Sequence, residues 1–208
     1  LDEVDRELER RGHRFARYAD DCNVYVCSRK AGERVMALLR RRYDKLCLKI
    51  NESKSAVASV FGRKFLGFEL YKTGKDEVKR AVSRKALETF KQKIRQLTRR
   101  SGGRSIEQVI EGLRPYVLGW KGYFGLAQTS KVWRTLDKWM RHRMRTIQLK
   151  HWKRGTTIYR ELLALGAPVV VAHRIAANSR RWQRNSRYLL NSIFTIAYFD
   201  RLGMPRLS

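Results

Sequence analysis

Two adjacent carboxylates, Asp20 and Asp21, lie between two short runs of strand-forming residues at 14–17 and 23–26. We expect a β-hairpin that carries the pair at its turn. Like charges on one bend repel each other unless a divalent cation or a basic partner offsets them. Because Mg²⁺ takes oxygen ligands, usually one or two carboxylates with substrate phosphates, the pair is a candidate metal site. The competing interpretation is an Asp-rich turn without a metal.

The residues around the pair predict the elements that must hold the hairpin. A helix precedes it, since Leu1, Val4 and Leu8 recur at helical spacing and Gly12 ends the pattern. A second helix is expected over residues 30–45, with Ser28 as a possible N-cap. Helices interleaved with antiparallel strands indicate an α+β module that ends near residue 80. Its further strands are expected at residues 46–50, 56–61 and 65–70, with a turn at 51–54.

Basic residues greatly outnumber acidic ones. Forty-seven Lys and Arg against nineteen Asp and Glu give a net charge of +28, and residues 71–208 alone carry +23. Such dense basic charge indicates a polyanionic partner. The alternative is an anionic membrane surface. No stretch approaches the roughly 20 apolar residues of a spanning helix, and the basic residues are not gathered in one amphipathic segment. We therefore favour nucleic acid and expect no membrane.

The second half of the sequence reads as helical. Ser83 is expected to cap a helix that runs to about Arg100, and residues 105–108 fit a capping box for the next helix. Pro115 is expected to kink or restart that second helix. A third helix is expected over residues 130–152, and a shorter helical segment from Gly155. The leading candidates for RNA phosphate contacts are Arg99, Arg100, Arg104, Lys121, Arg141, Arg143, Arg145, Arg180 and Arg181.

Cysteine and histidine give no second site. The three cysteines are odd in number and include no Cys-x-x-Cys, so neither a zinc site nor a disulfide framework is indicated. The four histidines lack metal-ligand spacing. No signal peptide is visible, and a reducing cytosol fits the cysteine content best.

Taken together, these features resemble the reverse transcriptases encoded by bacterial group II introns. Residues 17–21, Arg-Tyr-Ala-Asp-Asp, look like the catalytic palm hairpin, and residues 48–54, Leu-Lys-Ile-Asn-Glu-Ser-Lys, look like the motif that follows it. Residues 65–68 are similar to the segment that grips the primer strand. Residues 113–124 resemble the maturase, or X, domain, which serves as the polymerase thumb and binds intron RNA. Residues 197–205 look like a family C-terminus without an HNH endonuclease.

The resemblance implies roles for individual residues. Asp20 and Asp21 would bind the catalytic metal, with two Mg²⁺ ions in a complete enzyme, and Lys54 would protonate or neutralise the leaving pyrophosphate. Tyr18, Leu66 and Gly67 would contact the primer and template. The implied partners are group II intron RNA, an RNA template with its DNA primer, and dNTP substrates.

The resemblance also implies an organisation of the chain. The C-terminal part of the palm is expected at residues 1–80, an all-α thumb or maturase domain at 81–153, and a basic helical segment at 154–208. The fingers and a palm half with a third metal-binding aspartate are expected to precede Leu1. We expect an RNA-directed DNA polymerase and maturase in the bacterial cytosol. The alternative, a non-catalytic RNA-binding splicing factor, would keep the maturase surface and merely retain the Asp pair.

Overall fold

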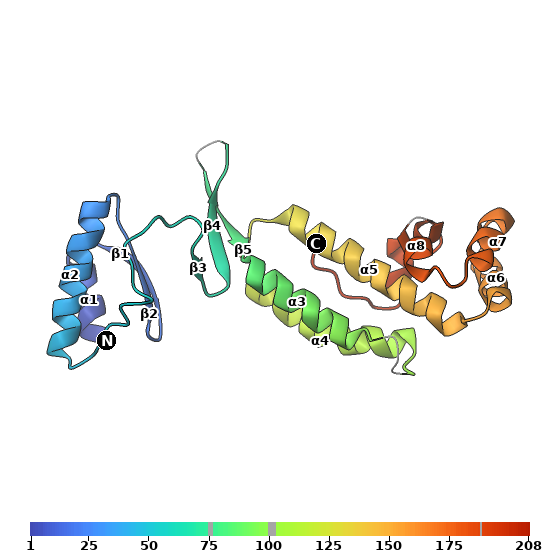
Figure 1. The fold of residues 1–208 in the computed structure, drawn as a ribbon, viewed down its shortest axis with the longest axis horizontal. Helices are drawn as coiled ribbons and strands as arrows, with labels where there is room; N and C mark the ends of the chain where they lie inside the picture. Colours follow the sequence, from blue (N-terminus) through green and yellow to red (C-terminus); the bar gives the residue numbers. More distant parts are fainter. Residues whose placement is uncertain (75–76, 100–102, 188) are drawn as a thin grey trace. The chain divides into compact units, whose positions relative to one another are not determined.

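The computed structural model describes residues 1–74, 77–99, 103–187 and 189–208 (Figure 1). The chain divides into two compact units, Leu1–Val60 and Phe61–Ser208. Both units contain helices and antiparallel strands, which confirms the α+β class. The predicted division of the chain into palm, thumb and basic segment stays a prediction.

The first unit is a hairpin backed by two helices. Strands β1 (Arg14–Tyr18) and β2 (Asp21–Tyr25) pair antiparallel, between helices α1 (Asp2–Arg10) and α2 (Arg29–Lys45) in the sequence. Val4, Leu8 and Val35 are buried between these elements, and one face of the hairpin packs on them through Phe15, Cys22 and Val24. Figure 1 shows both helices on the same side of the hairpin. On the other face of the hairpin, Tyr18, Asp21 and Tyr25 are exposed.

The end of α2 differs from the prediction. The Ser28 hydroxyl accepts the Ala31 amide, as expected of an N-cap. The strand predicted at residues 46–50 is wrong: the amide of Leu48 bonds back to the Tyr43 carbonyl at 2.9 Å, and Cys47 has a φ of 55°. These bonds close the helix in a left-handed C-terminal turn, so the backbone groups that a strand would need are already used.

A three-stranded antiparallel sheet begins the second unit. Its strands are β3 (Lys64–Phe65), β4 (Phe68–Lys72) and β5 (Val78–Val82), in that order. The single strand predicted over 65–70 is wrong, because Leu66 and Gly67 both have positive φ, 51° and 80°, and turn the chain. The strand predicted over 56–61 is also wrong. There, only Phe61 bridges to Leu70.

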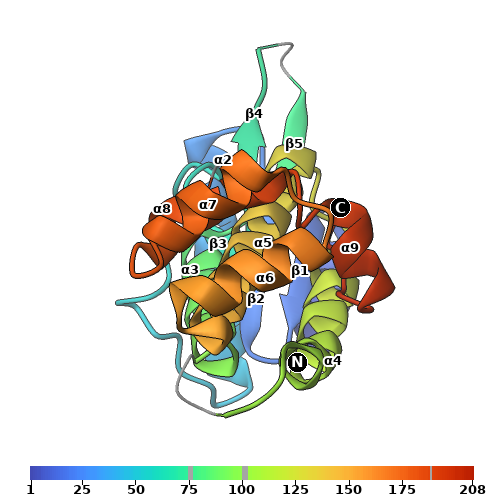
Figure 2. The ribbon, with the colours of Figure 1, turned by 90° about the vertical axis from the view of Figure 1, so that its right-hand side faces the viewer.

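Helices make up the rest of the second unit. Figure 1 shows α3 (Arg84–Leu97), α4 (Ile106–Phe124) and α5 (Ser130–Trp152) side by side along their lengths. Figure 2 shows α6 (Gly155–Ala164) packed against α7 (Val169–Ala177). Their core includes Phe90, Leu113, Leu136 and Met140, all fully or almost fully buried. The helices are α3 (Arg84–Leu97), α4 (Ile106–Phe124), α5 (Ser130–Trp152), α6 (Gly155–Ala164), α7 (Val169–Ala177), α8 (Trp182–Arg187), the 3₁₀ turn η1 (Leu189–Asn191) and α9 (Ile196–Arg201).

Local signals predicted these helix starts well. The Ser83 hydroxyl accepts the Ala86 amide, and Ser105 and Gln108 form the full capping box. Of the two outcomes predicted at Pro115, the restart is wrong, since α4 runs through that residue without a break, and the kink stays a prediction. Pro115 and Glu111, whose carbonyl loses its helical donor, both lie on the exposed side of α4, where water can satisfy that carbonyl. Among the described residues, none of the helices combines the length and apolar character that a membrane span requires.

Candidate active site and nucleic-acid interface

The Asp pair lies at the tip of the first hairpin. Tyr18 pairs with Asp21 across the two strands, so Ala19 and Asp20 alone form the turn. Ala19 has a φ of 52°, a conformation that costs an alanine on the order of 1 to 2 kcal/mol. Both aspartates are exposed. The strained turn therefore presents two adjacent carboxylates to solvent.

Arg17 anchors the hairpin from behind. Its Nε donates to Asp5 of α1 at 2.6 Å, and its Nη1 donates to the Tyr43 hydroxyl of α2 at 3.2 Å. The Arg17 side chain is only 10% exposed. Because side chains alternate along a strand, Tyr18 lies on the opposite face and is 64% exposed. The helices therefore hold one face of the hairpin, while Tyr18 and its cross-strand partner Asp21 occupy the open face.

The thiol beside Asp21 adds no charge. Cys22 pairs with Arg17 across the hairpin and packs toward the helices. Burial raises the pKa of the Cys22 thiol, so it stays protonated near neutral pH. The aspartates are thus the charged groups at the tip.

Asp20 and Asp21 fit a partial magnesium site. They supply two hard oxygen donors on one exposed turn, and Mg²⁺ commonly binds one or two carboxylates with waters and phosphates completing its shell. Asp2 and Asp5 are used elsewhere, in ion pairs with Arg6 and Arg17. In the described part of the chain, no three His, Cys, Asp or Glu side chains gather closely enough to hold a metal ion.

Lys54 belongs to a different turn from Asp20 and Asp21. It is exposed in the turn after α2, where its amide bonds to the Asn51 carbonyl at 3.1 Å. Within the described residues, no hydrogen bond or ion pair joins Lys54 to Asp20 or Asp21. The structure thus brings the two carboxylates together, whereas the role of Lys54 stays a prediction.

Leu66 and Gly67 form the tight turn between β3 and β4. Both turn carbonyls have donors: the Tyr123 hydroxyl binds Leu66 O at 3.1 Å, and the Ser83 amide binds Gly67 O at 2.8 Å. Atoms of the Phe124 ring lie 3.0 and 3.1 Å from where a Cβ on residue 67 would sit, so a side chain there would have to displace the ring, and the φ of 80° also favours glycine. The end of α4 and the start of α3 therefore fix this turn.

Three of the predicted RNA-binding residues that are at least partly exposed also bind within the chain. Arg104 donates to the Leu97 carbonyl at 2.8 Å, and Lys121 donates to the Arg206 carbonyl at 3.1 Å. Arg143 binds the Thr98 hydroxyl at 2.7 Å and lies over the Trp139 ring. These side chains hold helices and loops together, which leaves them less free to bind a ligand.

Arg145 is buried, with only 7% of its surface exposed. It donates to the Phe194 carbonyl at 3.2 and 3.3 Å and to the Ser186 carbonyl at 3.4 Å. Burial, with a smaller effect of nearby Arg141, lowers the pKa of Arg145 to about 10. It remains charged at neutral pH, and its main visible role is to join α5 to the segment that follows α8.

Other predicted residues are better placed for a polyanion. Arg99, Arg180 and Arg181 are exposed, and none of them forms an ion pair with a described residue. Arg141 is half-buried, and burial lowers its pKa. Arg100 lies outside the described residues.

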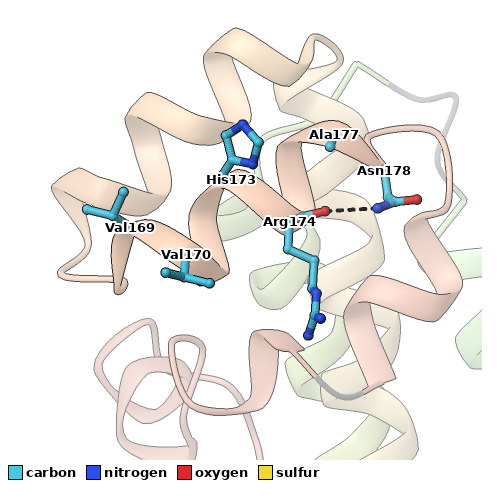
Figure 3. Close-up of a pocket in the computed structure, with 6 residues that line it drawn as sticks. All are labelled: Val169, Val170, His173, Arg174, Ala177 and Asn178. Carbon is cyan, nitrogen blue, oxygen red and sulfur yellow. Dashed lines mark hydrogen bonds between the residues drawn. The ribbon is translucent and has the colours of Figure 1, made fainter.

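A hollow of about 500 Å³ lies on the surface of α7 and just beyond its end. Figure 3 shows the Arg174 side chain extending from the helix and Asn178 bonding back to the Arg174 carbonyl. The Asn178 Nδ2 lies 3.0 Å from that carbonyl oxygen. Val169 and Val170 are exposed beside it. Because all its lining residues come from this one short segment, the hollow is a surface groove and offers no converging set of catalytic groups.

The sequence prediction missed Asp137, a buried carboxylate of α5. It binds the backbone of residues 207 and 208 and the Ser208 hydroxyl at 2.7 to 2.9 Å. One signal was available, since Asp137 is the only acidic residue in Ser130–Trp152. A lone carboxylate on an otherwise basic helix indicates a specific partner.

Comparison with known families agrees with this arrangement of an Asp–Asp hairpin followed by a basic helical unit. Residues 1–70 match the family model described as reverse transcriptase (RNA-dependent DNA polymerase). Residues 87–164 match the group II intron, maturase-specific domain. A search of curated proteins found no match. The first match indicates the class, a reverse transcriptase. The two matches together support a group II intron reverse transcriptase/maturase.

Proposed function

We propose that the chain supplies the metal-binding hairpin and the RNA-binding helical unit of an RNA-directed DNA polymerase that also acts as an intron maturase. The observation that supports this most is the exposed Asp20–Asp21 pair on the open side of a helix-backed hairpin. That hairpin lies inside the segment that matches the reverse transcriptase family.

Asp20 and Asp21 would hold Mg²⁺. When bound, the metal would offset phosphate charge, make the attacking hydroxyl more acidic and stabilise the negative charge on the leaving pyrophosphate. The chain's own contribution is position: Arg17, fixed by Asp5 and Tyr43, keeps the hairpin tip in place. Tyr18 and Asp21 project from the same open face, which would receive primer, template and nucleotide.

The second unit would bind the nucleic acid. Residues 71–208 carry a net charge of +23, which is suited to phosphate contacts with intron RNA and with a template–primer duplex. Exposed arginines such as Arg99, Arg180 and Arg181 would make these contacts first. A location in the bacterial cytosol stays a prediction.

The metal assignment is tested by binding as well as by activity. Mn²⁺, used in place of Mg²⁺, should bind the parent chain, and Asp21→Asn should weaken that binding at least tenfold. Asp44→Asn is the control, since Asp44 is an exposed aspartate of the same unit on α2. In primer extension on an RNA template, any Mg²⁺-dependent synthesis should disappear in Asp21→Asn and persist in Asp44→Asn. Equal Mn²⁺ binding by the two variants would contradict the metal site.

A further inference from the structure

The turn between β3 and β4 has an unfavourable backbone that other residues must hold. Leu66 has a φ of 51°, and Gly67 follows it with a φ of 80°. Glycine adopts such values freely, but a leucine in this region is uncommon and costs on the order of 1 to 2 kcal/mol. The surrounding structure has to offset that strain, so the groups that bind the turn determine its conformation.

Two of these groups come from helices. The Ser83 amide binds Gly67 O at 2.8 Å, and Ser83 is itself fixed as the N-cap of α3. The Tyr123 hydroxyl binds Leu66 O at 3.1 Å from the last turn of α4. The second bond is the more exposed of the two, because Tyr123 is 55% exposed whereas Ser83 is 1% exposed.

Aromatic packing places the Tyr123 hydroxyl. The Tyr123 ring stacks near Phe68, with centroids 6.1 Å apart, and meets the Phe124 ring edge-on at 4.8 Å. Phe68 follows the turn directly, so the Tyr123 ring and hydroxyl contact consecutive parts of the same hairpin. Removal of the hydroxyl alone would keep the stacking and release only the Leu66 carbonyl.

The same place faces solvent with little side-chain cover. Leu66 is 37% exposed, and Gly119 and Gly122 of α4 have open space where a Cβ would be. A nucleic-acid strand could approach the backbone of α4 closely here. Tyr123 therefore lies where the Leu66–Gly67 turn meets the exposed surface of α4.

We propose that Tyr123 is a positioning residue, whose hydroxyl holds the Leu66–Gly67 turn in the conformation that meets the primer strand of a template–primer duplex. This assignment rests on the proposed polymerase function. In the absence of the hydroxyl, the Ser83 amide and the Phe124 ring would still hold Gly67, but the Leu66 carbonyl would lose its donor. The turn would then relax at Leu66.

The chain offers a matched control for the hydroxyl. The Tyr71 hydroxyl of β4 also donates to a backbone carbonyl, that of Gln128, at 3.3 Å. Tyr123→Phe and Tyr71→Phe thus each remove one hydroxyl bond between the sheet and the helical part of the same unit. Only the first removes a bond to the turn.

The test measures three quantities on the full chain and both variants: thermal unfolding, amide hydrogen exchange of residues 66–68, and affinity for an RNA–DNA template–primer duplex. We expect faster exchange and about fivefold weaker duplex binding in Tyr123→Phe alone, the size that one hydrogen bond typically gives. Both variants should unfold at similar temperatures.

The outcomes separate this assignment from the proposed function. Unchanged exchange in Tyr123→Phe would overturn the claim that the hydroxyl holds the turn. Faster exchange with duplex affinity equal to that of Tyr71→Phe would overturn the primer role and leave the proposed function standing. A parent chain that fails to bind the duplex would instead count against the proposed function, and this assignment would fall with it.

Discussion

Asp137 Oδ2 accepts two hydrogen bonds from Ser208, one from the backbone N–H at 2.9 Å and one from the hydroxyl at 2.7 Å. Its other oxygen accepts the Leu207 amide at 2.9 Å. Two basic residues of α4 bind the same C-terminal segment: Arg114 donates to the Gly203 carbonyl, and Lys121 donates to the Arg206 carbonyl. We call residues 203–208 the C-terminal strap.

The strap should depend on the Asp137 carboxylate. Asp137→Asn keeps the shape but replaces one acceptor oxygen by a donor, which leaves the strap amides poorly satisfied. Because bonds to a charged acceptor contribute on the order of 1.5 to 3 kcal/mol, we expect a loss of about 3 kcal/mol in the free energy of unfolding. Urea unfolding measures it. The control is Asp44→Asn, an exposed aspartate that should change stability by less than about 0.5 kcal/mol.

Glu7 should make the first unit sensitive to acid. It forms ion pairs with Arg10, Arg11 and Arg42. These bonds hold the pKa of Glu7 well below its usual 4.5, and the bond with Arg10 has the largest effect. A lowered folded pKa stabilises the fold above the ordinary value, and the stabilisation is lost as pH falls through and below about 4.5.

The comparison of Glu7→Gln with the parent tests this. The variant should unfold at lower temperature than the parent at pH 7, and the difference should shrink steadily below about pH 4.5. Glu3→Gln, an exposed acidic residue of the same helix, provides the control. A difference that stays constant from pH 7 to pH 3 would show that charge on Glu7 is not the cause.

Ala19 should tolerate glycine and gain from it. At a φ of 52° an alanine is strained, so Ala19→Gly relieves that cost, although glycine makes the unfolded chain more flexible and so loses more entropy on folding. We expect a net gain of about 0.5 to 1 kcal/mol in the free energy of unfolding. Ala19→Val should lose stability, since a β-branched residue suits positive φ least. Chemical denaturation of both variants is the measurement, and equal stability of the two would contradict the left-handed turn.

The exposed arginines after α7 should account for part of the salt dependence of RNA binding. Arg180→Ala with Arg181→Ala should lower the slope of log affinity against log salt by about 1 to 2, as expected for one or two lost phosphate contacts. Arg6→Ala with Arg29→Ala removes the same charge from residues that already pair with Asp2 and Glu33. Filter binding across a salt series compares the two. An equal change in slope would mean that net charge alone governs binding.

Sequence reasoning succeeded where the signal is local. The caps at Ser28, Ser83 and Ser105 each depend on a hydroxyl and an amide three residues later, and all three are present. The Asp20–Asp21 hairpin was likewise readable, because strand-forming residues flank it on both sides. In each of these cases the residues that determine the structure are close together in the sequence.

Sequence reasoning failed where the structure depends on one backbone angle or on a partner that is distant in the sequence. Residues 46–50 alternate like a strand, but the left-handed Cys47 ends α2 there and directs the Leu48 amide back to the helix. The Asp137–Ser208 bonds span 71 positions, and no pattern near either residue identifies the other. The roles of Tyr123 and Arg17 were hidden for the same reason, since their partners belong to other elements.

The C-terminal strap also sets the order in which the protein can fold during synthesis. Asp137 emerges 71 residues before Ser208, an interval of roughly 4 to 14 s at ordinary translation rates of about 5 to 20 residues per second. During that interval the long helices still wait for Phe194, Phe199 and Leu207, which are made one after another and belong to the same buried core. The nascent chain thus holds an incomplete apolar core until its last residues have been made, and exposed apolar surface of this kind favours aggregation.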